Sequence, residues 1–222
     1  MTRPNLLLIG LTGALLAWGC GDDTTASDLS GAHDLSANAD MAASTPSCSA
    51  YCTTIQANCT GAIGANMMYP NMQSCLHACA LFSVGTSADT SGDTLGCRLY
   101  HANAAKGDPA THCPHAGPSG GGVCGTDRCA AFCELASAVC TSANGLPGTF
   151  PFTSKSQCMS VCGTAPFKFD TTMPEQQEAG ATLNCAFYHL TEAFVDPNPD
   201  AGATASDHCE DFDPNNAGRG CQ

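Results

Sequence analysis

Four histidines recur at matching positions in the two halves of this chain, and they are the residues most able to carry chemistry. They are His101 and His112 in the first half, and His189 and His208 in the second. If the two histidines of one half converge, their neutral imidazoles could bind zinc or copper together with a nearby carboxylate. The alternative is structural: each imidazole packs against disulfides and donates to a backbone carbonyl. The other histidines, His33, His77 and His115, have no matching histidine in the opposite half.

The spacing of the cysteines shows how the two halves of the chain align, and so which histidines match. The chain has 17 cysteines in 222 residues, and all but one fall into two blocks that share the spacing C-x3-C-x6-C followed by C-x3-C. The first block contains Cys48, Cys52, Cys59, Cys75, Cys79, Cys97, Cys113 and Cys124, and the second contains Cys129, Cys133, Cys140, Cys158, Cys162, Cys185, Cys209 and Cys221. The segments Thr94–His101 and Thr182–His189 also align. The two blocks are therefore tandem copies of one module.

The leftover cysteine, Cys20, lies at the end of a short N-terminal apolar run. Arg3 precedes that run, which covers residues 6–18 and is typical of the hydrophobic region of a signal peptide. The pair Gly19-Cys20 is similar to a bacterial lipobox, which predicts a lipid on Cys20. Ordinary signal-peptidase cleavage after Gly19 is the alternative, and it would give a secreted protein. An even cysteine count in each block predicts disulfides formed in an oxidising compartment.

Composition divides the chain into four segments. Residues 21–47 contain no lysine, arginine or aromatic residue, so this stretch cannot bury enough surface to order itself. We therefore expect a signal peptide at 1–19, a lipidated cysteine and disordered linker at 20–47, and cysteine-rich modules at 48–124 and 125–222.

Cysteine spacing within each block predicts helices. Positions i, i+4 and i+11 lie within about 40° of one another on a helix, so the first three cysteines of a block share one face. The expected helix starts are Pro46-Ser47 for the first helix, Thr126 or Asp127 for its copy, Asp93 for a third helix reaching Gly107, and Pro174 for a copy reaching Phe194. The expected fold class is all-α, small and disulfide-rich, with two tandem three-helix, cysteine-stapled modules.

The disulfide pairing can be guessed from the expected antiparallel helices. The guess joins Cys52 to Cys79, Cys59 to Cys75, Cys133 to Cys162 and Cys140 to Cys158, among 105 possible pairings in each block. Each bridge should contribute about 2–4 kcal/mol, which a module with so few large apolar side chains needs.

Charge and absent motifs exclude several functions. A net charge of −13 disfavours nucleic-acid binding. The chain lacks C-x-x-C and H-E-x-x-H, so we expect no cofactor and no enzyme activity, with a small disulfide-rich hydrolase as the weakest alternative. Gly120-Gly121-Gly122 is interpreted as a turn. The acidic group Asp207, Glu210, Asp211 and Asp213 is interpreted as a solvated turn, with a calcium site as the alternative.

The leader and linker of residues 1–47, with the cysteine ladder of residues 48–221, resemble uncharacterised cysteine-rich bacterial lipoproteins. The resemblance implies a lipid-anchored protein of the bacterial envelope, at the outer membrane, and no particular activity. The leading hypothesis is a non-catalytic module that binds a protein, glycan or small ligand. The alternative is a metal-binding protein that uses the four repeated histidines.

Overall fold

A computed structural model describes residues 45–61, 66–125, 127–141, 150–164, 167–194, 205–214 and 220–221. Regular structure in these ranges is helical, and β-structure is limited to isolated bridges such as the one between Ser83 and Thr94. The expected all-α, disulfide-rich fold class is confirmed. None of the described helices is both long and apolar enough to cross a membrane. Cys20, the expected signal peptide and most of the expected linker lie outside the described residues.

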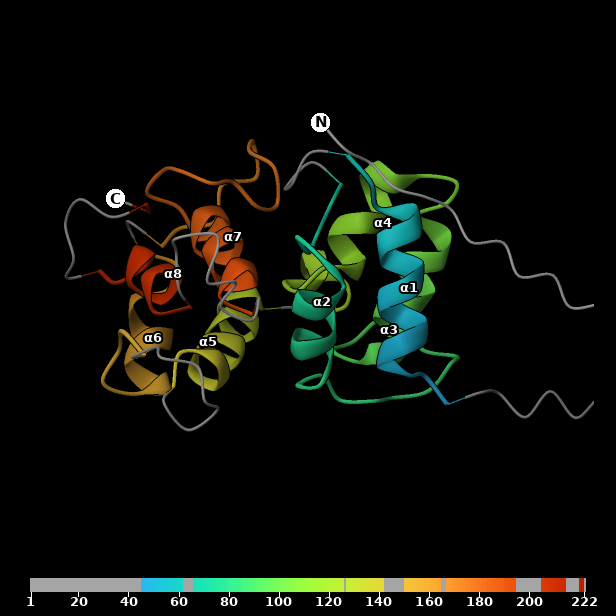
Figure 1. Cartoon of the computed structure of the whole chain (residues 1–222), viewed down its shortest axis with the longest axis horizontal. Helices are drawn as coiled ribbons and strands as arrows, with labels where there is room; N and C mark the ends of the chain where they lie inside the picture. The colour runs from blue at the N-terminus through green and yellow to red at the C-terminus, as the bar shows by residue number, and fades with distance from the viewer. Residues whose placement is uncertain are drawn as a thin grey trace, which may run out of the picture. The chain divides into compact units, whose positions relative to one another are not determined.

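The first block is a cluster of short helices around α1. Its elements are α1 (Cys48–Asn58), α2 (Met72–Cys79), α3 (Leu95–Ala104), α4 (Pro109–Ala116) and the 3-10 turn η1 (Gly120–Gly122). Helix α1 contacts α2, α3 and α4, as Figure 1 shows, and α4 also packs on α3. Tyr51 and Ile55 of α1 are buried at this junction. The core of the block therefore lies along α1.

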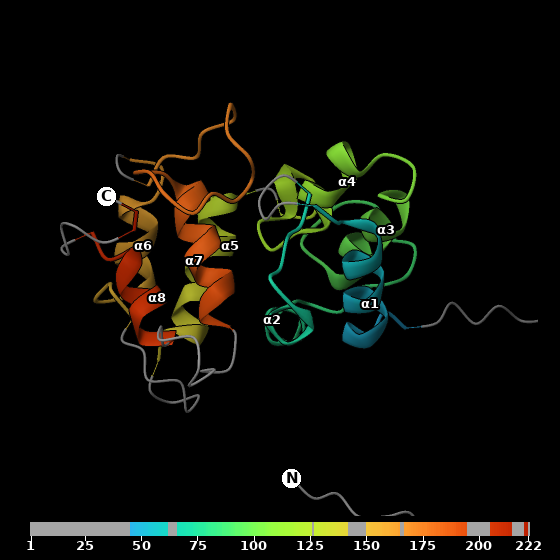
Figure 2. The same cartoon turned by 45° about the horizontal axis from the view of Figure 1, so that its top comes forward.

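The second block repeats this order of helices around a more aromatic core. Its elements are α5 (Arg128–Val139), α6 (Lys155–Val161), α7 (Leu183–Ala193) and α8 (Ala205–Asp211). Helix α7 contacts both α5 and α8, as Figure 2 shows. The ring of Phe132 lies 5.6 Å from that of Phe187 and 5.3 Å from that of Phe212, both in edge-on geometry. These three rings join α5, α7 and the end of α8.

Side-chain caps explain where most helices begin. In each case an oxygen of the residue before the helix accepts from a backbone N–H of the first turn, which satisfies a donor that the helix leaves free. The capping residues are Ser47, Asn71, Thr94, Asp108, Asp127, Ser154 and Thr182. The cap of α3 is thus Thr94, one residue after the expected cap at Asp93.

Two features of the helices differ from the sequence prediction. Each block has a fourth helix, α4 or α8, that the cysteine pattern did not indicate. The expected helix from Pro174 to Phe194 is wrong in its first part, because α7 begins only at Leu183. The reason is that Glu175 and Gln176 are buried in contacts with the first block. Those contacts hold residues 174–182 in a non-helical path.

Disulfides join the sixteen block cysteines in the same pattern twice. The pairs are Cys48–Cys79, Cys52–Cys75, Cys59–Cys113 and Cys97–Cys124 in the first block, and Cys129–Cys162, Cys133–Cys158, Cys140–Cys209 and Cys185–Cys221 in the second. The guessed pairing is wrong. The first and second helices meet one turn out of the guessed register, so Cys59 and Cys140, the C-caps of α1 and α5, bond to the unexpected fourth helices instead.

Hydrogen bonds also join the two blocks to each other. The division into two modules after residue 124 stays a prediction. Glu175 of the second block accepts a hydrogen bond from the Ser119 hydroxyl of the first. Within its own block, it also accepts one from Nε of Arg128 at 3.1 Å. Gln176 Nε2 donates to the Met68 carbonyl at 2.8 Å, and Ser74 Oγ donates to the carbonyl of Thr191 at 2.6 Å.

Glu175→Ala should lower the free energy of unfolding by about 1–3 kcal/mol, because it leaves the buried Ser119 hydroxyl without its acceptor. Glu134→Ala is the matched control. Glu134 pairs with Lys155, and both side chains are about half exposed, at 59% and 49%, so that change should cost less than about 1 kcal/mol. Urea denaturation of the two variants gives the comparison, and equal losses would contradict the role given to Glu175.

Candidate metal centres

Three histidines converge in the first block. His101 comes from α3, while His112 and His115 lie three residues apart on α4. Candidate ligand atoms of the three residues lie within 4.8 Å of one another. Nδ1 of His101 is 2.8 Å from Nδ1 of His112, and the ring centres of His101 and His115 are 4.8 Å apart. The repeated histidines therefore meet, and His115, which the repeat had left out, joins them.

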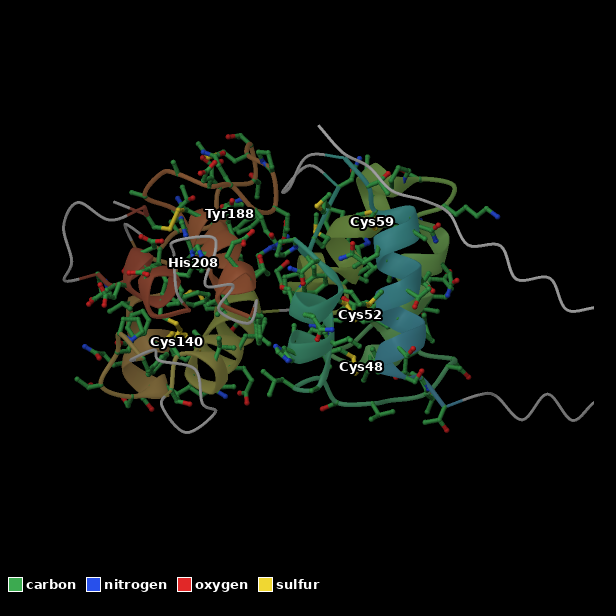
Figure 3. The ribbon with its side chains drawn as sticks, in the orientation of Figure 1. Cys48, Cys52, Cys59, Cys140, Tyr188 and His208 are labelled. Atoms are coloured by element: carbon green, nitrogen blue, oxygen red, sulfur yellow. A yellow bond between two sulfur atoms is a disulfide. The ribbon has the colours of Figure 1, made fainter. Side chains whose placement is uncertain are left out.

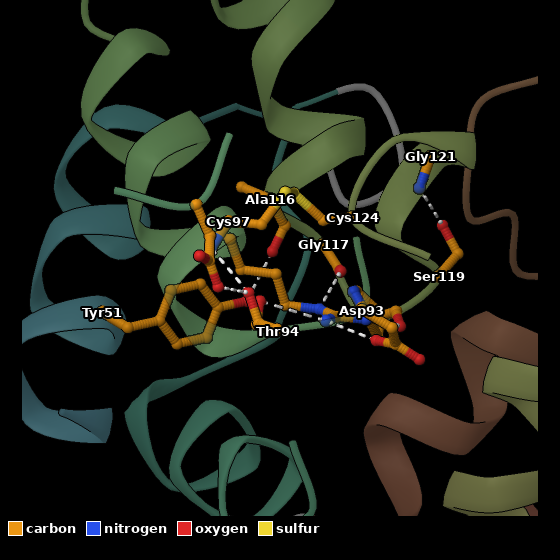
Figure 4. Close-up of polar contacts among 12 residues, drawn as sticks. Tyr51, Asp93, Thr94, Cys97, Ala116, Gly117, Ser119, Gly121 and Cys124 are labelled. Atoms are coloured by element: carbon orange, nitrogen blue, oxygen red, sulfur yellow. Dashed lines mark hydrogen bonds and ion pairs between the residues drawn. A yellow bond between two sulfur atoms is a disulfide. The ribbon is translucent and has the colours of Figure 1, made fainter. Parts of the chain in front are cut away.

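The end of α4 is held by polar contacts from two other helices. The buried hydroxyl of Tyr51, on α1, donates to the Ala116 carbonyl at 2.6 Å (Figure 4). Arg98, on α3, has a side chain only 1% exposed and donates to the Gly117 carbonyl at 3.3 Å and to Asp93 at 2.7 Å. A cation at a helix C-terminus complements the helix dipole. These contacts place His112 and His115 against His101.

Disulfides flank the same residues. Cys113 follows His112 directly and ties α4 to the end of α1 through Cys59. Cys97 precedes His101 by one helical turn and is bonded to Cys124 (Figure 4). Sulfurs of this disulfide lie within 4.8 Å of a His101 nitrogen, but a disulfide sulfur is a poor metal ligand because the thiolate is the ligating form.

The second block brings together two histidines and a carboxylate. Nδ1 of His189, on α7, lies 3.4 Å from Nδ1 of His208, on α8, and 2.9 Å from Oδ2 of Asp211. The same Asp211 oxygen is 3.7 Å from Nδ1 of His208. Figure 3 shows Tyr188 and His208 on these two helices. Residues 205–211 are therefore a helix that contributes Asp211 to the cluster, which corrects the expectation of a solvated turn there.

The two centres are copies of one arrangement. Nε2 of His101 donates to the Thr90 carbonyl at 3.2 Å, and Nε2 of His189 donates to the Glu178 carbonyl at 2.9 Å. The ring centres of His101 and His112 are 5.1 Å apart with planes tilted by 35°, and those of His189 and His208 are 5.7 Å apart with a tilt of 33°. In both copies one imidazole is oriented by a backbone carbonyl while its Nδ1 faces the partner histidine. In metal sites, a hydrogen bond from the other ring nitrogen to a carbonyl is what orients a ligating histidine.

The third member of each centre was missed by the sequence analysis. His115 and Asp211 occupy equivalent positions, three residues after His112 and His208, in His-Cys-Pro-His and His-Cys-Glu-Asp. His115 has no histidine at the equivalent position of the second block, because Asp211 stands there. Comparing residues by ligand chemistry, with histidine and aspartate treated as alternatives, would have found both.

Burial keeps several of these imidazoles neutral. Burial is the main cause that lowers the pKa of His101, and the neighbouring His112 lowers it further. The pKa of His115 is lowered by burial, then by His101, His112 and Arg128. Burial and the nearby His189 lower the pKa of His208. A lowered pKa leaves the imidazole lone pair available at neutral pH, which is the form that binds metals.

In the second centre, two atoms that act as acceptors face each other. His189 uses its Nε2 hydrogen on Glu178, yet its Nδ1 faces Asp211, a carboxylate that can only accept. A further proton, on His189 or on Asp211, or a metal ion must lie between these atoms. In the first centre, the buried Nδ1 of His115 has no hydrogen-bond partner among the described residues.

In each centre, the backbone of a glycine lies against a histidine ring. A Cβ on Gly121 would lie 2.8 Å from Cδ2 of His115, and one on Gly220 would lie 2.6 Å from Nε2 of His189. Gly121 also has a positive φ of 54°, which favours glycine. The triple glycine is therefore a turn, as expected, and it also lets the backbone approach the His115 ring.

Comparisons with known proteins relate part of the chain to fungal proteins. Residues 22–128 match the BfoA family C-terminal domain, a range that includes the three clustered histidines of the first centre. Aurasperone B biosynthesis cluster protein A of Aspergillus niger is 38% identical over 78 residues, which are 35% of this chain and 25% of that protein. Bifonsecin B biosynthesis cluster protein A of Aspergillus brasiliensis is 37% identical over 78 residues, with the same coverage of 35% and 25%. No solved structure matches the chain.

These matches cover only about a quarter of the length of the fungal relatives. They overturn the resemblance to bacterial lipoproteins, because the similar proteins come from Aspergillus and not from bacteria. The expected location in a bacterial envelope is wrong for the same reason. That resemblance rested on a leader type and a cysteine count, both of which unrelated exported proteins can share.

Proposed function

We propose that this protein is a non-catalytic binding protein whose ligand is a divalent transition-metal ion, with one site in each cysteine block. The first site consists of His101, His112 and His115. The second consists of His189, His208 and Asp211. The observation that supports the proposal best is the repetition: two copies of the module bring three ligand-type side chains together at equivalent positions.

The distances in the second site fit a metal ion. Ligands that bind at 2.0–2.1 Å in a tetrahedron are about 3.3 Å from one another. The three ligand-to-ligand distances of 2.9, 3.4 and 3.7 Å lie around this value. In the first site, the 2.8 Å between Nδ1 of His101 and Nδ1 of His112 would have to open by about half an ångström for the same tetrahedron.

The site chemistry narrows the choice of ion. Imidazole suits zinc, copper, nickel and iron, whereas calcium and magnesium prefer sites built from oxygen. Three protein ligands leave a fourth position for water or another ligand. The eight disulfides favour maturation in an oxidising compartment, where the sixteen bonded cysteines would not compete for the ion.

The structural alternative makes a different prediction. In it, His112 Nδ1 donates to His101 Nδ1, and a protonated His189 pairs with Asp211, so no ion is needed. Protein prepared without a chelating tag, loaded with Zn(II) and desalted, should contain about two zinc ions per chain if the sites bind metal, and none under the alternative. Elemental analysis by mass spectrometry measures this directly.

Single substitutions should remove one site each. We expect His112→Ala and His208→Ala to retain about one zinc ion per chain, and the double variant to retain none, because a direct ligand is lost. His77→Ala is the control, since His77 lies outside both clusters and donates to the Phe194 carbonyl. A loss of zinc in the control equal to that in the site variants would indicate a folding effect.

A further inference from the structure

We propose that the two sites select different metals, and that the residue at position 115 or 211 sets this selectivity. The inference rests on the proposed function. Each site has an equivalent pair of histidines, so the third member is what distinguishes them: an imidazole from His115 in the first and a carboxylate from Asp211 in the second.

The third ligand changes the chemistry of the site. Three imidazoles form a neutral, all-nitrogen set that suits zinc and copper. A carboxylate adds a harder oxygen donor and a negative charge, and carboxylate ligands suit manganese. Two histidines with one carboxylate are also the ligand set of non-haem Fe(II) centres. The second site should therefore discriminate less strongly against Mn(II) and Fe(II) than the first.

The two carboxylate oxygens of Asp211 have different partners. Its Oδ1 accepts from the backbone N–H of Gly220 at 3.3 Å, and its Oδ2 faces His189 and His208. The carboxylate side chain is only 17% exposed. This arrangement directs one oxygen at the two imidazoles, where a metal would bind, and ties the other to the backbone.

Charged residues near each site favour the same metals as the ligands of that site. Arg128 lies close enough to His115 for its positive charge to act on that imidazole. Asp207 and Asp211 lie close enough to His208 for their negative charges to act there. Harder ions depend more on charge attraction than on covalent bonding to nitrogen, so they gain more in the second site.

The first part of the test measures each site alone. His208→Ala leaves the first site, and His112→Ala leaves the second. Zn(II) affinity is measured by competition with a chelating dye, and Mn(II) affinity by the electron paramagnetic resonance signal of the free ion. We expect the ratio of Mn(II) to Zn(II) affinity to be higher in the second site by about tenfold or more. Substituting residues that only contact a ligand already alters metal affinity by about 10–100-fold, and here a ligand itself differs.

The second part exchanges the third ligands. In the first-site protein, His115→Asp should raise the Mn(II) to Zn(II) ratio toward that of the second site. In the second-site protein, Asp211→His should lower it. The matched controls are His115→Asn and Asp211→Asn. Asparagine has the size of aspartate but supplies no carboxylate, so neither control should raise the ratio. Equal ratios in the two sites, or ratios unmoved by both exchanges, would overturn the proposal.

The two hypotheses fail in different ways. If neither single-site protein binds Zn(II) or Mn(II), the proposed function is wrong, whereas binding with equal selectivity contradicts only the selectivity inference. Intact mass after alkylation verifies the eight disulfides in every variant, and circular dichroism verifies the helices. If Asp211→His fails these checks, His115→Asp decides the question, because His115 is partly exposed and lies beside a turn.

Discussion

Replacing Cys59 and Cys113 together by alanine is expected to lower the free energy of unfolding by about 4 kcal/mol and to weaken zinc binding at the first site. The stability loss follows from the long loop that this bridge closes, with a sequence separation of 54 residues, since a longer loop gains more entropy when it is opened in the unfolded chain. The binding loss follows because Cys113 adjoins His112 and holds α4 in place. Thermal denaturation and zinc titration of the double variant measure the two effects.

The matched control is the pair Cys48 and Cys79. Their bridge has a sequence separation of 31 residues, so its removal should cost between about 3 and 4 kcal/mol by the same reasoning. It joins α1 to α2, neither of which carries a histidine of the centre, so zinc affinity of the folded protein should stay unchanged. If both double variants lose zinc equally, the Cys59–Cys113 bridge does not position the site.

Saturating zinc is expected to stabilise the folded protein strongly. Zinc at 100 times its dissociation constant contributes about 2.7 kcal/mol for one site, and two sites that share no ligand should contribute about 5 kcal/mol together. For a chain of this size the melting temperature should rise by about 10–20 °C. Scanning calorimetry with zinc, and with a chelator, gives the difference.

Substitutions should divide that stabilisation between the sites. His101→Ala should lose about half of the shift, and His101→Ala combined with His189→Ala should lose nearly all of it. Magnesium at the same concentration is the control ion, because it prefers oxygen ligands and holds its water tightly. A melting temperature that zinc and the chelator both leave unchanged would be evidence for purely structural histidines.

The pairing of the disulfides was within reach of the sequence but needed a stricter rule. In two antiparallel helices, the residue numbers of facing pairs have a constant sum. Among pairings of the first three cysteines with the next two, only Cys48–Cys79 combined with Cys52–Cys75 satisfies that rule. The guessed pairing is wrong because Cys59 lies at the C-cap of α1 and does not face α2.

Local sequence determined the helical fold class, the first turns of α1 and α5, and the existence of a repeated cysteine framework. These features depend on short-range rules: sulfurs at helical spacing, capping side chains and an alignment of the two blocks. The repeat also identified four of the six residues in the candidate sites. Each of these predictions needed only neighbours along the chain or a second copy of the same pattern.

Tertiary structure alone decided that the site residues converge and how the blocks meet. His115 and Asp211 become site members only because α4 and α8 fold back onto α3 and α7, with Cys59–Cys113 and Cys140–Cys209 holding them there. The segment before α7 loses its predicted helix because Glu175 and Gln176 bond to the first block. The physical reason is the same in both cases: contacts between residues distant in sequence outweigh local preference, and no spacing within one segment encodes them.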